Sequence, residues 1–211
     1  MHAILGDDGE RVVELLAADP SLAAAEGEQS PILTALFRGR AEPLGALLGT
    51  RPPVNVFEAA ALGIDQLVGQ YCFAQPELVT ASTADGYTLL HLAAYFGHVT
   101  TATLLLECGA DVAAVSRDDA EGTPLHAAAA GRQHALCWLL LAHGAPVDAQ
   151  QTGGFTALHA AARYGDLAIV QLLVVNGADP WLEADDGKIA ADIAYEFDHD
   201  AVAAYLRTHM A

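Results

Sequence analysis

The chain has 211 residues, of which 53% are hydrophobic and 7% are aromatic. Its formal net charge is −18, because it carries 27 acidic side chains and nine basic ones, and Lys188 is its one lysine. A charge of this sign repels phosphate backbones and anionic membrane surfaces and attracts basic proteins. We therefore expect neither a nucleic-acid nor a membrane ligand. The acidity has two explanations: it keeps an alanine-rich chain soluble, or it attracts a basic protein partner.

The sequence predicts no secretory or membrane segment. Its start, Met1–Asp8, lacks the basic and apolar zones of a signal peptide. No apolar run approaches the roughly 18 residues that suggest a membrane-spanning helix. The cysteines Cys72, Cys108 and Cys137 have no regular spacing, which argues against a disulfide framework or a cysteine zinc site. We expect a cytoplasmic protein with reduced thiols.

The first third of the chain contains a degenerate repeating pattern. Glu10–Leu22 is typical of an outer helix and its exit, which Pro76–Val79 echoes. Ser30 followed by Pro31 predicts a helix start, since serine caps helices and proline fits their first position. Phe57–Gly63 aligns with a later short helix, with Phe57 in the place of a histidine and no Thr-Pro start.

From Asp85 onward one phrase recurs at a fixed period. Its copies are Thr88-Leu-Leu-His91, Thr123-Pro-Leu-His126, Thr156-Ala-Leu-His159 and a degenerate Ile189-Ala-Ala-Asp192. The last residues of successive copies are 35, 33 and 33 positions apart. Such a period predicts a solenoid, in which each unit buries its apolar face against its neighbours.

Each period predicts a short helix, a leucine-rich helix and a tight hairpin. The threonine caps the short helix, small alanines let neighbouring helices approach, and Gly97 and Gly165 end it in the left-handed conformation. The second helix ends at a Gly-Ala dipeptide. Dipeptides such as Asp85-Gly86 and Asp186-Gly187 then favour tight turns with positive φ.

Two positions depart from the repeat pattern and should change the local structure. Arg132 stands where Gly97 and Gly165 end the other short helices, so we expect a reshaped turn there. The segment 116–121 lies in a connection with two more residues than later ones, which predicts a longer hairpin finger. An alternative is that this acidic finger contacts a partner.

The Thr-Pro-Leu-His-x-Ala phrase and its period resemble the ankyrin-repeat family, of bacterial type. The resemblance implies an all-α repeat solenoid of stacked helix-turn-helix units joined by β-hairpin loops, elongated and with a concave groove. We expect a single ankyrin-repeat domain over 1–211. Its expected parts are an N-terminal cap or partial repeat (1–29), degenerate repeats (30–55, 56–84), repeats (85–118, 119–151, 152–184) and a C-terminal capping repeat (185–211).

The resemblance also implies where a protein partner binds. In this family, contacts come from the hairpin tips and from the two residues before the glycine that ends each short helix. Carried over, these positions include Phe37, Arg38, Leu62, Tyr87, Tyr95, Phe96, Phe155, Arg163, Tyr164 and Phe197. Tyrosine and arginine on a rigid face often carry binding energy. Packing between repeats is the alternative for each ring, and the sequence leaves that choice open.

The sequence predicts neither a metal site nor catalysis. The resemblance implies that the recurring histidines are structural, bonded to nearby backbone or threonine groups, and zinc ligands must instead converge on one centre. The histidines at 98, 134, 143, 199 and 209 are expected to be solvated. Phosphate-binding loops, nucleophile elbows and His-Glu-x-x-His motifs are absent. We expect no enzyme activity, metal or cofactor.

These observations favour a monomeric, non-catalytic scaffold or adaptor that binds a partner protein through its concave face. The first alternative is a dedicated inhibitor or chaperone-like regulator of a single enzyme, which would form a tight and lasting complex. A third reading is an enzyme accessory or small-ligand-binding protein, which would need a closed pocket.

Overall fold

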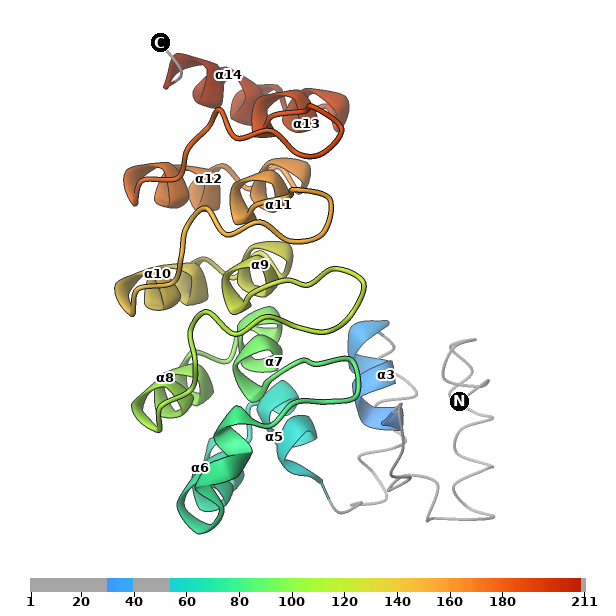
Figure 1. The fold of residues 1–211 in the computed structure, drawn as a ribbon, viewed down its shortest axis with the longest axis vertical. Helices are drawn as coiled ribbons and strands as arrows, with labels where there is room; N and C mark the ends of the chain where they lie inside the picture. Colours follow the sequence, from blue (N-terminus) through green and yellow to red (C-terminus); the bar gives the residue numbers. More distant parts are fainter. Residues whose placement is uncertain (1–29, 40–53, 210–211) are drawn as a thin grey trace.

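The computed structural model describes residues 30–39 and 54–209. Within these ranges the chain forms a stack of paired helices (Figure 1). The inner column contains α5 (Val56–Leu62), α7 (Leu89–Phe96), α9 (Pro124–Ala130), α11 (Ala157–Arg163) and α13 (Ala190–Glu196). The outer column contains α6 (Asp65–Ala74), α8 (Val99–Glu107), α10 (His134–Ala142), α12 (Leu167–Val175) and α14 (Asp200–Thr208). The expected all-helical ankyrin-type stack is confirmed, whereas the helix expected at 10–22 and the cap at 1–29 lie outside the described residues.

The inner helices begin where the sequence predicts caps. In α7 and α11 the hydroxyl of Thr88 or Thr156 accepts from the backbone N–H three residues later. In α5 the predicted register was wrong by one residue. Asn55 caps that helix, and Glu58 rather than Phe57 occupies the histidine position, with its carboxylate accepting from the Asn55 N–H at 3.0 Å. A carboxylate at this position forms the same capping box as the usual Ser/Thr–Glu pair.

The inner helices end in a left-handed residue, as expected for Gly97 and Gly165. The third repeat reaches the same turn with different residues, because Arg132 itself takes φ 57°. Gly131 precedes it in a helical conformation, and a Cβ there would lie 2.2 Å from the Tyr95 carbonyl oxygen. The repeat therefore has the same left-handed turn as its neighbours. Glycine is needed at position 131 because the backbones of two repeats approach closely there, and not because φ is positive.

The core runs the length of the stack between the two columns. The inner helices contribute small fully buried residues, such as Ala93, Ala128 and Ala161, which allow close spacing. The outer helices contribute larger ones, including Leu105, Leu140 and Leu173. Burial of this continuous apolar surface holds each unit against its neighbours, because no unit encloses a core of its own.

The connections between repeats are hairpin-like fingers without extended strands in the described ranges. Only isolated bridges, Ser82 with Thr88 and Glu183 with Ile189, are of the β type there. One backbone hydrogen bond joins each pair of neighbouring fingers: Arg117 N–H to Asp85 at 3.0 Å, Thr152 N–H to Ala120 at 2.9 Å, and Asp185 N–H to Gly153 at 2.9 Å. The fingers therefore form a connected row beside the inner helices (Figure 1).

Helix α3 (Pro31–Phe37) lies out of line with the inner column (Figure 1). Ser30 caps it, accepting from the Leu33 N–H at 3.2 Å, as the sequence predicts. It lies against α5, and the Phe37 ring at its end packs on Phe96 of α7, with centroids 5.1 Å apart. The end of α3 thereby becomes a wall of the surface described below.

We predict that Leu105→Ala lowers the free energy of unfolding by about 2–5 kcal/mol, because it leaves a cavity among fully buried neighbours in α8. Val175→Ala is the control, since that side chain is 80% exposed, and its change should stay within about 0.5 kcal/mol. Urea unfolding of the three proteins measures both values, and equal midpoints for all of them would contradict the core assignment.

We predict that one of the three thiols reacts quickly with iodoacetamide at pH 7.5 in the native protein. Cys108 is exposed, whereas Cys72 and Cys137 are buried. Burial, aided by the nearby Cys108, raises the pKa of Cys72 to about 11, and burial with the Asp166 charge raises the pKa of Cys137 to about 12. Because the thiolate is the reactive form, these two should react only after unfolding in urea. Mass spectrometry of the alkylated peptides identifies the modified residue, and rapid native modification of all three would contradict this.

Candidate functional site

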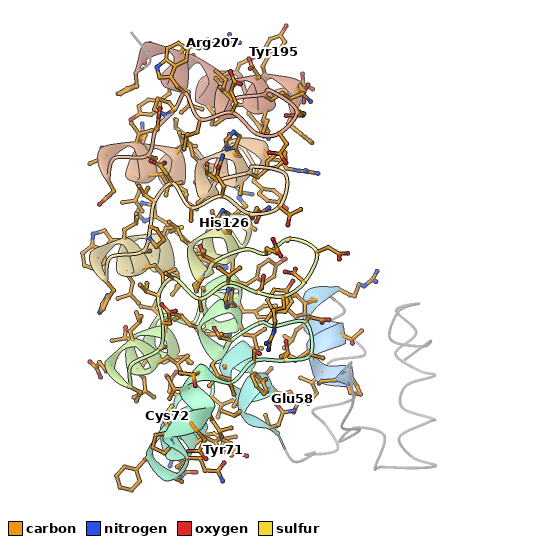
Figure 2. All side chains as sticks on the ribbon, viewed as in Figure 1. Glu58, Tyr71, Cys72, His126, Tyr195 and Arg207 are labelled. Carbon is orange, nitrogen blue, oxygen red and sulfur yellow. The ribbon has the colours of Figure 1, made fainter. Side chains whose placement is uncertain are left out.

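The recurring histidines join each repeat to the next. The Nδ1 atoms of His91, His126 and His159 accept from the N–H of the threonine that caps the same helix, at 3.2, 3.2 and 3.1 Å. Each ring therefore carries its proton on Nε2, which donates to a carbonyl of the following repeat: Gly122 at 3.0 Å, Phe155 at 3.2 Å or Lys188 at 3.3 Å. The structural role that the resemblance implied for these histidines is confirmed; Figure 2 labels His126 in the middle of the stack.

A second row of bonds runs in the opposite direction at the other end of the inner helices. His98 donates from Nε2 to the Ala61 carbonyl at 2.8 Å, and His199 donates to the Arg163 carbonyl at 3.1 Å. Gln133 does the same for Tyr95 at 3.3 Å. The expectation that His98 and His199 are solvated was therefore wrong. They are half-buried, because each fills the space beside a left-handed glycine of the preceding repeat.

These two rows fix the backbone under several residues of the predicted site. The carbonyls of Phe155, Tyr95 and Arg163 each accept one of these inter-repeat bonds. Their side chains are not part of these bonds and line the two hollows described next. The repeat architecture therefore holds these side chains in defined positions without using their chemistry.

Two adjoining hollows lie between the inner helices and the fingers. The first encloses about 330 Å³ and is walled by Phe37, Tyr87, Tyr95 and Asp118. The second encloses about 430 Å³ and is walled by Phe155, Arg163, Tyr164 and Asp119. Both share Ala120, His126, Ala130 and Gln151 in their lining, so they form one continuous groove over the third described repeat.

The groove exists because the third repeat has small residues at the predicted contact positions. Gly122 occupies its finger tip and Ala130 its helix end, where neighbouring repeats carry Tyr87, Tyr95 and Phe155. The absence of bulk over α9 leaves space between two aromatic walls. A small residue between large ones at equivalent repeat positions is a signal that could have located the groove from the sequence.

The predicted aromatic residues divide into packed and exposed members. Phe37 lies against Tyr87, Tyr95 and Phe96 with ring centroids 5.9, 5.5 and 5.1 Å away, and the last three side chains are half-buried. Phe155 is also half-buried and lies edge-on to His159. Tyr164 and Phe197 are exposed, and the Arg163 guanidinium lies 5.0 Å from the centroid of the Phe197 ring. The set therefore combines a packed cluster at one wall with freer rings at the other.

Four predicted residues do not line the two hollows. Arg38 is exposed just after α3, and Leu62 is half-buried at the end of α5. Phe96 packs behind Phe37, and Phe197 contacts Arg163 outside the second hollow. Sequence reasoning did not select Trp138 and Trp181, each 59% exposed, or Tyr195, 62% exposed, near which Arg207 lies (Figure 2). These rings lie outside the contact positions that the family pattern gives, so that pattern carried no signal for them.

The longer finger is confirmed, and it folds back toward the groove. Asp118 accepts from Ser116 Oγ, from the Tyr87 hydroxyl and from the Glu121 N–H. Burial alone would raise the pKa of Asp118, but the bonds from Ser116 and Tyr87 outweigh it and hold that pKa below its usual value. Burial, followed by the bond to Asp118, raises the pKa of Tyr87 well above its usual value. A carboxylate thus stands in the groove wall, charged at neutral pH.

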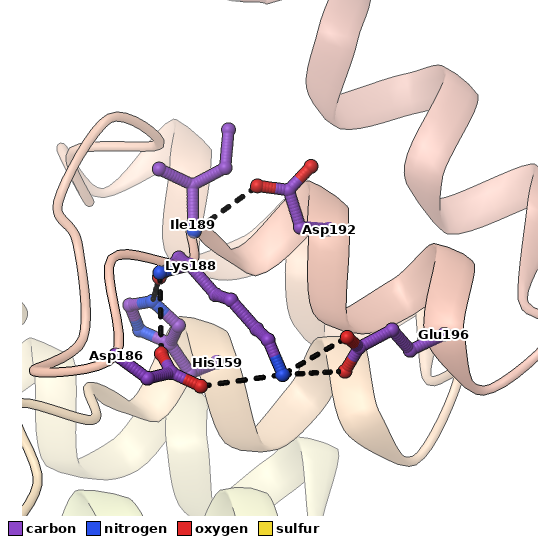
Figure 3. Close-up of polar contacts among 6 residues, drawn as sticks. All are labelled: His159, Asp186, Lys188, Ile189, Asp192 and Glu196. Carbon is purple, nitrogen blue, oxygen red and sulfur yellow. Dashed lines mark hydrogen bonds and ion pairs between the residues drawn. The ribbon is translucent and has the colours of Figure 1, made fainter.

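The tip residue of the last repeat has its charge neutralised within the chain. Lys188 Nζ lies 2.9 Å from Glu196 Oε1 and 3.2 Å from Asp186 Oδ2 (Figure 3). Beside it Asp192, which replaces the histidine, accepts from the Ile189 N–H at 3.4 Å. The carboxylates of Asp186 and Glu196 therefore neutralise the positive charge of Lys188 at this tip.

Within the described part of the chain, no three His, Cys, Asp or Glu side chains gather closely enough to hold a metal ion. None of the helices described there is long and apolar enough to cross a membrane.

The geometry defines a class of helical repeat protein that presents one continuous face built from loops and short helices. A family model described as ankyrin repeats (3 copies) matches residues 1–151, 113–184 and 135–210. The chain belongs to the ankyrin-repeat family. Repeats of this family are generally protein–protein interaction modules.

Curated relatives resemble parts of the chain. It is 39% identical over 124 residues to the Transient receptor potential cation channel subfamily A member 1 homolog of Caenorhabditis elegans, covering 58% of this chain and 10% of that protein. It is 40% identical over 99 residues to the B-cell lymphoma 3 protein homolog of Mus musculus, covering 47% and 22%. Ankyrin repeat domain-containing protein 37 of Bos taurus is 38% identical over 106 residues, covering 49% and 65%. The chain thus spans less than two-thirds of these relatives.

We predict that the buried histidines lower the free energy of unfolding when the pH is decreased. Burial lowers the pKa of His91, His126 and His159 in the folded protein. Because the unfolded chain takes up protons first, near pH 6.5, their contribution is complete above that pH and is lost as the pH falls below it.

The measurement compares urea midpoints at pH 7.5 and 5.5 for the wild type and His126→Gln, whose amide can accept and donate at similar positions. The decrease should be smaller in the variant, and the comparison cancels the effect of the many carboxylates. Equal decreases would show that His126 does not resist protonation.

Proposed function

We propose that this protein is a non-catalytic scaffold or adaptor that binds a partner protein along the groove over α9. The observation that carries the proposal is the pair of adjoining hollows, walled by Tyr87 and Tyr95 on one side and Phe155, Arg163 and Tyr164 on the other. Aromatic and arginine side chains on a fixed backbone bring large contact area at little entropic cost, as binding surfaces require.

The shape of the groove supports a protein ligand. The groove is open along the stack, which suits an extended segment or a protein edge more than an enclosed small molecule. We propose a monomer acting in the cytoplasm, of the bacterial type that the repeat phrase resembles, with no role on nucleic acid or membranes.

The second candidate, a dedicated inhibitor or chaperone-like regulator of one enzyme, uses the same groove. It is favoured by the rigidity of the site, since a fixed surface suits a single tight partner. Such a complex should bury about 800 Å² per partner or more and survive purification. An adaptor releases its partner more readily, so the lifetime of the complex distinguishes an adaptor from an inhibitor.

We predict that replacing Tyr95 and Tyr164 together with alanine weakens partner binding by more than about 2 kcal/mol while unfolding stays cooperative. Tyr95 lines the first hollow and Tyr164 the second, so the double variant removes one ring from each wall. Affinity capture from lysate of the source organism, followed by mass spectrometry, gives the partner, and calorimetry with that partner gives the energy.

The matched control is the double variant Trp138→Ala and Trp181→Ala, which removes two exposed rings outside the groove. Partner binding lost in the tyrosine variant and kept in the tryptophan variant would support the groove. The reverse result would move the site to the surface around these tryptophans, and equal binding by all three proteins would overturn the assignment.

A further inference from the structure

The two hollows of the groove differ in charge. The second contains Arg163 together with Asp119, so both signs of charge are present. The first has Asp118 as its ionised side chain, and the His91 and His126 rings in its lining are neutral, because their Nδ1 atoms accept from the N–H groups of Thr88 and Thr123. Among the described residues, ion pairs join Arg132 to Asp166 and Lys188 to Asp186 and Glu196, and none involves Asp118.

The basic residue next to Asp118 does not neutralise it. Arg117 directs its guanidinium to Ser82 Oγ, at 2.6 Å, in the neighbouring finger. The bonds that Asp118 accepts come from the neutral groups of Ser116, Tyr87 and the Glu121 backbone. Among the residues that the structure describes, these donors fix the carboxylate without neutralising its negative charge. Within the same residues one hydrogen bond reaches Oδ2, from the Tyr87 hydroxyl, so this oxygen can accept a further hydrogen bond.

Aromatic faces stand next to this charge. Phe37, Tyr87 and Tyr95 line the same hollow, and their rings are tilted by 36° and 46° about Phe37 instead of being stacked flat. The face of an aromatic ring carries negative charge density and attracts cations. The volume of about 330 Å³ equals roughly ten water molecules at ~30 Å³ each, enough for one long side chain.

We propose that the first hollow receives an arginine side chain of the partner protein, with its guanidinium against the Tyr95 ring and its charge facing Asp118. This inference rests on the proposed function and names the chemistry of the partner segment. Arginine fits better than lysine because its planar group is weakly hydrated and stacks on aromatic faces, while lysine holds its water more strongly. The net charge of −18 attracts a basic segment toward the groove from a distance.

The test is a titration of the ¹⁵N-labelled full chain with the capped tripeptide Gly-Arg-Gly, followed by NMR. Saturable shifts are expected at the amides of Tyr95, Ala120 and Gly122. The peptide with norleucine in place of arginine, which has no charge, should bind at least about fivefold more weakly, and the lysine peptide should also bind more weakly. Equal binding by the norleucine peptide would overturn the proposal, and equal binding by the lysine peptide would overturn the choice of arginine.

Variants locate the binding. Tyr95→Leu, which keeps an apolar side chain without a ring, should weaken the arginine peptide at least about fivefold, and Tyr95→Phe should restore binding to within about twofold. Asp118→Asn should weaken it similarly. Glu107→Gln is the charge-matched control, because Glu107 is exposed on the outer helix α8, and it should leave binding unchanged.

If the Glu107 and Asp118 variants lost the same amount of affinity for the arginine peptide, the attraction would come from the overall charge, and the proposed site would be wrong. Urea midpoints confirm that each variant is folded, and Tyr95→Leu keeps the test decisive even where the Asp118 change disturbs the finger. Capture of a partner that requires Tyr95 and Tyr164, but whose binding segment lacks arginine, would refute this inference and leave the proposed function standing.

Discussion

The structure depends on hydrogen bonds that join successive short helices. At the start of α7, α9 and α11, a neutral histidine accepts from the cap of its own helix and donates to the next repeat. At the end of α5, α7 and α11, a backbone carbonyl accepts from a side chain of the next repeat. Apolar burial supplies most of the stabilisation of the stack, but it is not directional. The bonds supply direction, because a buried carbonyl left without its donor costs about 1–3 kcal/mol. They therefore fix the distance and rotation between repeats.

This arrangement separates structure from recognition at single residues. The backbone carbonyls of Tyr95, Phe155 and Arg163 hold the stack together, while their side chains face the groove. A change of side chain at these positions leaves the inter-repeat bond in place. The binding surface can thus vary with little cost to the fold. The surface is also rigid before binding, so a partner loses little energy in ordering it.

The sequence predicted most of the fold and less of the site. The period, the threonine caps and the glycine ends depend on local chemistry, which one sequence displays directly. The start of α5 was misaligned because Asn55 and Glu58 form the same capping box with different residues. His98 and His199 were misjudged because their partners are carbonyls 36–37 residues away. The aromatic residues were found, but their division into packed and exposed members depends on α3, and no repeat pattern shows that Phe37 at its end packs on Phe96 of α7.

The position of Asp118 shows how an acidic protein can present a charge for binding. An exposed carboxylate loses its water when a partner covers it, and this loss offsets much of the attraction. Asp118 is already half-buried and is held by three donors of its own chain, so part of that cost is met during folding. Its charge then acts in a surrounding of rings, where electrostatic interactions are stronger than in open water. The two extra residues of this finger give the chain room to turn Asp118 inward, which makes the insertion a determinant of the groove's charge.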